Sequence, residues 1–220
     1  MSDHGTAEGH ALDHAHQFDD AEQQRDASTL GMWVFVAQEI LFFGGLFTAY
    51  TVYRSAHPEA FAHASHHLDI MLGGFNTVVL IASSLTMALA VHAAQLGKRG
   101  GQVLFLLLTM ALGSVFLGVK LIEYGHKFHE GFVPGPNFTY PGSEARYAEM
   151  FFSLYFAMTG LHALHMVIGI GILAVLVAMA LRGRFGPAYY TPVEVSGLYW
   201  HFVDIVWIFL FPLLYLIGRH

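Results

Sequence analysis

Five long apolar stretches constrain this chain more than any other feature of its sequence. Each exceeds the roughly 20 residues that a helix needs to cross about 30 Å of hydrocarbon. They are also far longer than the strands of about ten alternating residues that build outer-membrane barrels. The pattern therefore predicts an all-α integral membrane protein that folds as a bundle of five transmembrane helices. The expected helices cover residues 30–53, 68–95, 102–124, 147–181 and 193–217.

The composition supports this class and excludes several others. Hydrophobic residues make up 55% of the chain and charged residues 12%, against about 25% charged in soluble domains. A net charge of -6, with no run of more than two basic residues, argues against a nucleic-acid partner. The chain has no cysteine, which excludes disulfides, covalent c-type haem, iron–sulfur clusters and thiolate copper sites within it. Any redox chemistry of this chain itself would have to use histidines.

The first 29 residues differ from the rest because they are polar and acidic. They lack a basic region followed by a short apolar core, so they do not form a secretory signal. We predict a disordered tail over residues 1–29 and a single membrane domain over 30–220. The tail is rich in histidine, which is a metal ligand, but no folded geometry enforces a site there. These histidines are His4, His10, His14 and His16.

Basic residues in the short connections predict the orientation. Cytoplasmic loops of membrane proteins carry an excess of Lys and Arg. This bias favours a cytoplasmic N-terminus and a C-terminus outside. In that orientation the inner connections carry Arg25, Lys98, Arg99, Arg182 and Arg184.

Three ionisable residues lie well inside the predicted helices. A charge near the middle of a bilayer costs at least a few kcal/mol, so Glu39, His201 and Asp204 should face protein, water or a partner rather than lipid. One interpretation is a proton-handling or partner-facing polar site. The other is that His201 and Asp204, three residues apart on one helix face, pair as satisfied interior groups. Spacing alone leaves both open.

His162 and His165 are also three residues apart and point to neighbouring spots on one face. They could be ligands to a metal, and a haem with two histidine ligands would need His92 or His201 on an opposing helix. We favour packed polar residues that bond to neighbouring helices, a role also assigned to Asn76. No metal site and no catalytic residue are therefore predicted.

Two further patterns predict local contacts. Lys120 and Glu123 fall near the end of the third apolar stretch, where an ion pair at the headgroup interface is expected. Small residues four apart let helix backbones approach closely in lipid. The two such pairs are Gly45 with Ala49 and Ser114 with Gly118.

Several motifs resemble subunit III of the haem-copper respiratory oxidases, in the same order along the chain. They cover nearly everything from residue 30 onward. The polar tail is not covered. The motifs are GMWVFVAQEILFF at 31–43, NT at 76–77, SSLT at 83–86, EY at 123–124, TGLH at 159–162 and YWHFVDIVW at 199–207.

The resemblance implies an accessory subunit of a proton-pumping terminal oxidase that reduces oxygen to water. Haems and copper would then lie in partner subunits and none in this chain. Subunit I would be the direct partner, with subunit II and, as an optional member, a small subunit IV in the same complex. The implied roles are support of proton uptake, binding of phospholipid and stability of the complex, in a bacterial inner membrane. Glu39 matches the family's membrane carboxyl, and Arg182, or Arg184 instead, its headgroup-binding arginine.

The chain departs from many family members because it matches five of their seven helices. The face of its first and last helices should therefore be covered by phospholipid or by another subunit. Five-helix forms occur in both the cytochrome c and the quinol branches, and Glu at position 39 favours the cytochrome c branch. Alternatives are the related subunit of a nitric oxide reductase, an autonomous di-haem cytochrome and a small transporter.

Overall fold

The computed structural model describes residues 21–141, 144–187 and 189–216. Its five long helices are long and apolar enough to cross a membrane, and none of the described residues forms a strand. The predicted all-helical bundle of five spans is therefore confirmed. The elements are α1 (Ala21–Ala56), α2 (Pro58–Ser65), α3 (Ile70–Gln95), α4 (Arg99–His129), α5 (Ala145–Leu181), α6 (Thr191–Phe211) and the π-helix η1 (Pro212–Leu216).

Two features differ most clearly from the sequence-based expectation. α1 begins at Ala21 rather than at residue 30, so residues 21–29 are helical and not part of a disordered tail. They are polar but rich in Ala, Glu, Gln and Arg, which favour helices without adding to hydropathy. The short helix α2 was not predicted, although Pro58 in its first turn is a usual helix-start residue. Residues 1–20, with the four tail histidines, lie outside the described residues.

Two tight turns close one end of the bundle, which we call the Arg25 end because α1 begins there. Gly97 and Gly183 adopt φ values of 66° and 71° after α3 and α5, a left-handed conformation that glycine adopts without strain. In each turn the next amide donates back to the preceding helix, as in a Schellman motif. Lys98 N donates to Ala93 O at 2.9 Å. The opposite end, which holds α2 and residues 130–141 after α4, is called the α2 end.

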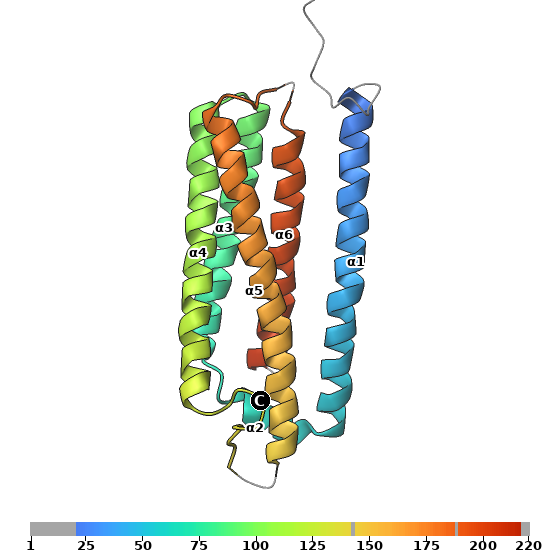
Figure 1. The fold of residues 1–220 in the computed structure, drawn as a ribbon, viewed down its shortest axis with the longest axis vertical. Helices are drawn as coiled ribbons and strands as arrows, with labels where there is room; N and C mark the ends of the chain where they lie inside the picture. The colour runs from blue at the N-terminus through green and yellow to red at the C-terminus, as the bar shows by residue number, and fades with distance from the viewer. Residues whose placement is uncertain (1–20, 142–143, 188, 217–220) are drawn as a thin grey trace, which may run out of the picture.

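Four of the long helices form a compact bundle and the fifth stands beside it (Figure 1). α3 packs on α4 and α6, while α5 packs on α4 and α6. α1 contacts only one side of this bundle, along α6 and α5. Only 6% of the membrane window of α1 is buried, against 56% for the last span. α1 is therefore the peripheral helix, and most of its apolar surface faces outward.

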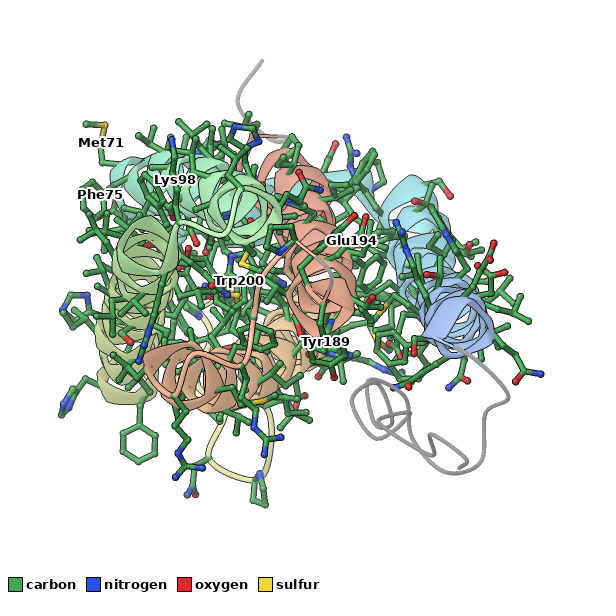
Figure 2. The ribbon with its side chains drawn as sticks, turned by 90° about the horizontal axis from the view of Figure 1, so that it is seen from above. Met71, Phe75, Lys98, Tyr189, Glu194 and Trp200 are labelled. Carbon is green, nitrogen blue, oxygen red and sulfur yellow. The ribbon has the colours of Figure 1, made fainter. Side chains whose placement is uncertain are left out.

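Trp200 fills the centre of the bundle (Figure 2). Its indole nitrogen donates to Ser83 Oγ at 2.9 Å. The ring fits because two glycines face it: a Cβ on Gly113 or Gly169 would lie within 2.8 or 2.9 Å of its ring carbons. These two glycines thus provide the close approach that the sequence analysis assigned to other small residues.

The predicted contacts of the two small-residue pairs were wrong within this chain. A Cβ added at Gly45 or Gly118 would meet nothing within 4 Å. Ser114 is also exposed, so these positions face away from the bundle. A four-residue spacing shows only which small residues permit a close approach. In this bundle the close approach occurs at Gly113 and Gly169, which face the large Trp200 ring.

Pro212 turns the end of the last span into a π-helix. Proline has no N–H to donate to the carbonyl four residues earlier, so a regular α-helix cannot continue through it. The chain responds with the wider π-turn η1, a local change that often marks functional positions. Leu214 and Tyr215 are thereby buried, and Tyr215 points its hydroxyl into the bundle.

Candidate functional site

A buried ion pair with two tyrosines lies inside the bundle toward the α2 end. Lys120 Nζ donates to Glu123 Oε2 at 2.9 Å, to Tyr155 OH at 3.0 Å and to Tyr215 OH at 2.9 Å. Both tyrosines in turn donate to Glu123 Oε1. Every ammonium proton therefore has an acceptor, and the carboxylate accepts three hydrogen bonds. The pair is closed on itself and fully satisfied.

The expectation of an ion pair here is correct, but its placement at the headgroup interface was wrong. Lys120 and Glu123 are only 3% and 2% exposed. Depth counted along one helix does not reveal which face turns inward, and the lysine turns toward α5 and η1. The Trp207 ring adds a cation–π contact at 5.2 Å from Lys120 Nζ. No pattern within α4 could have identified these partners, because they lie 35 or more residues away in sequence.

Glu39 lies at the contact of α1 with α5. Its carboxyl is 9% exposed, and its Oε2 lies 3.3 Å from His165 Nε2. Phe43 and Tyr50, which share its helix face, are buried as well. Glu39 thus faces the bundle rather than open lipid. Its imidazole neighbour was not foreseen because it lies on another helix.

The backbone fixes the His165 ring beside Glu39. His165 Nδ1 lies 2.9 Å from the carbonyl oxygen of Leu161, which can only accept, so Nδ1 donates this hydrogen bond. His165 Nε2 then lies 3.3 Å from Glu39 Oε2, but this oxygen has no partner with hydrogen-bond geometry among the described residues. The two groups are therefore close neighbours without a formed hydrogen bond.

The other two packing residues behave differently from each other. Asn76 is fully buried, and its Nδ2 donates to the Phe116 carbonyl at 3.3 Å, which ties α3 to α4. His162 is also buried, but neither ring nitrogen has a hydrogen-bond partner among the described residues. Its ring instead lies 5.3 Å from those of Phe116 and Trp207. The prediction that His162 bonds to a neighbouring helix was therefore wrong.

The histidines of the di-haem alternative are not brought together. His165 faces α1, His162 lies among aromatic rings, His201 contacts Ser84, and His92 is exposed on α3. Among the described residues, no three His, Cys, Asp or Glu side chains are grouped so that they could hold a metal ion. This arrangement gives no support to a haem held by opposing histidines.

His201 and Asp204 do not pair with each other. His201 Nδ1 lies 2.7 Å from Ser84 Oγ on α3. Asp204 is 3% exposed and lies beside the same serine, yet neither of its carboxyl oxygens has a partner with hydrogen-bond geometry. Both side chains line a groove of about 490 Å³ between α3 and α6. The interior-pair interpretation thus fails, and Asp204 has only the neighbouring Ser84 hydroxyl, without a well-formed hydrogen bond, among the described residues.

A second groove, of about 560 Å³, runs between α1 and α6. Its lining is apolar except for His201 and the indole of Trp33. A polar cavity of about 650 Å³ lies one helical turn further toward the Arg25 end, between the start of α1 and the connection into α6. It contains Arg25, whose Nη2 lies 3.5 Å from Glu194 Oε2 at its edge.

The two arginines predicted to bind a headgroup lie at the same end but line neither space. Arg182 and Arg184 are both exposed where α5 ends. Arg25, which the sequence analysis used only for orientation, occupies the place between apolar groove and polar surface. Its position became visible only once α1 was seen to begin at Ala21.

Comparisons with known proteins agree with this architecture. The family model for cytochrome c oxidase subunit III matches residues 12–219. The chain is 33% identical over 210 residues to cytochrome c oxidase subunit 3 of Thermostichus vulcanus, covering 95% of this chain and 94% of that protein. It is also 33% identical over 190 residues to quinol oxidase subunit 3 of Bacillus subtilis, covering 86% of each. With matches of this extent on five membrane-spanning helices, the chain belongs to the cytochrome c oxidase subunit III family, the third subunit of haem-copper terminal oxidases.

Proposed function

We propose that this chain is a non-redox subunit of a cytochrome c oxidase in a bacterial cell membrane, with its N-terminus in the cytoplasm. The match to the family over residues 12–219 carries this proposal. Subunit I, holding the haems and copper that reduce oxygen, would be the direct partner, with subunit II in the same complex. The role of this chain would be to stabilise that complex and to support proton uptake.

The electron donor is the least constrained part of the proposal. Named relatives of both the cytochrome c and the quinol kind share 33% identity with the chain. Glutamate rather than aspartate at position 39 favours cytochrome c. The related subunit of a nitric oxide reductase is a further alternative.

Affinity purification through a tag on this chain tests these statements together. We expect subunits I and II to copurify and the complex to consume oxygen with reduced cytochrome c. Oxygen uptake with quinol alone would assign the quinol branch. Nitric oxide reduction would assign the third alternative. A stoichiometric haem b spectrum from this chain purified alone would overturn the accessory role.

The Glu39–His165 pair is the proposed proton-related element. It is buried, and a groove at α1 and α5 lined by Gln38 and Phe42 reaches it from the outer surface. A proton that passes between a buried carboxyl and a neighbouring imidazole leaves the total charge of the pair unchanged. We expect infrared difference spectra of the working complex to show a carboxyl band that disappears in Glu39→Gln. Glu22→Gln, on the exposed start of the same helix, is the control.

Phospholipid is proposed to occupy the α1–α6 groove. An apolar groove open to the membrane is filled by acyl chains or protein, since a void loses dispersion contacts. The polar cavity at the Arg25 end suits a headgroup, because guanidinium binds phosphate through charge-assisted hydrogen bonds. Arg25→Ala should lower copurifying phospholipid, measured by mass spectrometry. The double variant Arg182→Ala, Arg184→Ala tests the anchors expected from sequence. If the double variant loses lipid and Arg25→Ala does not, the headgroup site is at Arg182 and Arg184 and not at Arg25.

A further inference from the structure

The α3–α6 groove has a different chemistry from the lipid groove beside it. Its rim is aliphatic and exposed, with Leu85 and Ile208 at 61% and 45%. Its floor holds Ser84, His201 and Asp204. Asp204 is 97% buried, and the Ser84 hydroxyl lies beside its carboxyl, but neither carboxyl oxygen has a partner with good hydrogen-bond distance and angles within the described chain.

An unpartnered carboxyl at this depth needs a donor from outside the chain. A buried polar group without a partner costs free energy comparable to a lost hydrogen bond, and more in a water-poor membrane. Asp204 lies 13 residues into α6, or about 20 Å along the helix. A lipid headgroup does not reach that depth, and an acyl chain has no donor. The donor must come from a protein side chain or from trapped water.

The shape of the groove favours a helix. Ser84 and Ala88 lie four residues apart on α3 and both line it, and small residues at this spacing let another helix approach closely. The aliphatic rim on both sides would then pack against the flanks of that helix. The exposed aliphatic rim, the small residues Ser84 and Ala88, and the buried Asp204 carboxyl together fit a neighbouring helix that carries one polar residue.

We propose that the α3–α6 groove is the docking site of a transmembrane helix from another oxidase subunit, which places a hydrogen-bond donor side chain against the Asp204 carboxyl. The donor is a hydroxyl, amide, indole or basic group at mid-membrane depth. The contact between His201 and Ser84 ties α6 to α3 at the floor of the groove. The inference rests on the proposed function only for the existence of a partner subunit.

Photocrosslinking in the intact complex tests the surface. p-Benzoylphenylalanine is introduced in place of Leu85 or Ile208, with Val175 on α5 as a matched control at 60% exposure. We expect crosslinks to one partner subunit from both groove positions and lipid adducts from position 175. Lipid adducts alone from positions 85 and 208 would overturn the proposal, and so would a partner crosslink from position 175 of equal yield. Copurification of subunit I in the same preparations tests the proposed function separately, because it does not depend on which crosslinks form.

Substitution of Asp204 tests the chemistry. Asp204→Leu removes an unsatisfied polar group, so the isolated chain in detergent should be at least as stable as the wild type. The complex should nevertheless lose its partner about 2- to 10-fold more readily, because one hydrogen bond between the helices is absent. Asp204→Asn, which keeps an acceptor, should restore part of the retention. If Asp204→Leu destabilises the isolated chain while partner retention stays unchanged, Asp204 is an internal structural residue and the proposal fails.

Discussion

Removing the buried lysine should destabilise the chain strongly. In Lys120→Met the methionine fills similar space, but Glu123 loses the cation that is paired with it and keeps two tyrosine donors. Breaking a buried ion pair from one side costs about 3 to 5 kcal/mol, since a charge is left uncompensated. At 1.4 kcal/mol for each factor of ten, the folded-to-unfolded ratio should fall by roughly 100- to 4000-fold.

The double variant separates the pair from its surroundings. Lys120→Met with Glu123→Gln leaves no charge in the cluster, and the glutamine oxygen still accepts from Tyr155 and Tyr215. We expect it to recover most of the loss and to lie within about 2 kcal/mol of the wild type. Lys98→Met, an exposed lysine at the Arg25 end, should change stability by less than about 0.5 kcal/mol.

Unfolding by dodecyl sulfate in mixed micelles provides the measurement. Trp207 lies 5.2 Å from Lys120 Nζ, so tryptophan emission reports on the cluster, and far-ultraviolet circular dichroism reports on the helices. A loss below about 1 kcal/mol in Lys120→Met would refute the argument, because it would mean that Glu123 finds water or a proton at little cost. A double variant as unstable as the sum of the two singles would refute the coupling.

Three further outcomes are expected. Gly113→Ala should lower the melting temperature of the chain, since its Cβ would lie 2.8 Å from Trp200 and overpacking costs about 1 to 3 kcal/mol, whereas Gly118→Ala should not. Burial, with Lys127 nearby, lowers the pKa of His67 below 6.5, so the unfolded chain binds its proton first and stability should fall as pH drops through that range; His67→Gln should flatten melting temperature against pH between 8 and 5. A hydrophobic carbodiimide should modify Glu39 before the exposed carboxylates, detected by peptide mass spectrometry; uniform labelling would count against its buried setting.

The number of spans and their approximate positions could be predicted from sequence because hydropathy is a property of each segment alone. The errors concern relations between segments. Lys120 was placed at the interface because depth was counted along α4, while its burial depends on tyrosines from α5 and η1. The partnership of Glu39 with His165 was missed for the same reason. His201 bonds to Ser84 on α3 and not to Asp204, and the missing hydrogen bond at Asp204 could be seen only once the neighbouring helices were in place.

The π-turn at Pro212 has a consequence for how the chain is made. Tyr215 on that turn completes the network around Lys120 and Glu123, which belong to a helix synthesised about 90 residues earlier. Synthesis proceeds at about 5 to 20 residues per second, so for several seconds the nascent chain holds two charged side chains in the membrane without their last donor. During that interval the insertion machinery, water or a chaperone has to shelter them. The network around the ion pair is therefore completed only after the π-turn has been synthesised. A nascent chain that ends before residue 215 lacks the hydroxyl that bonds to both Lys120 and Glu123.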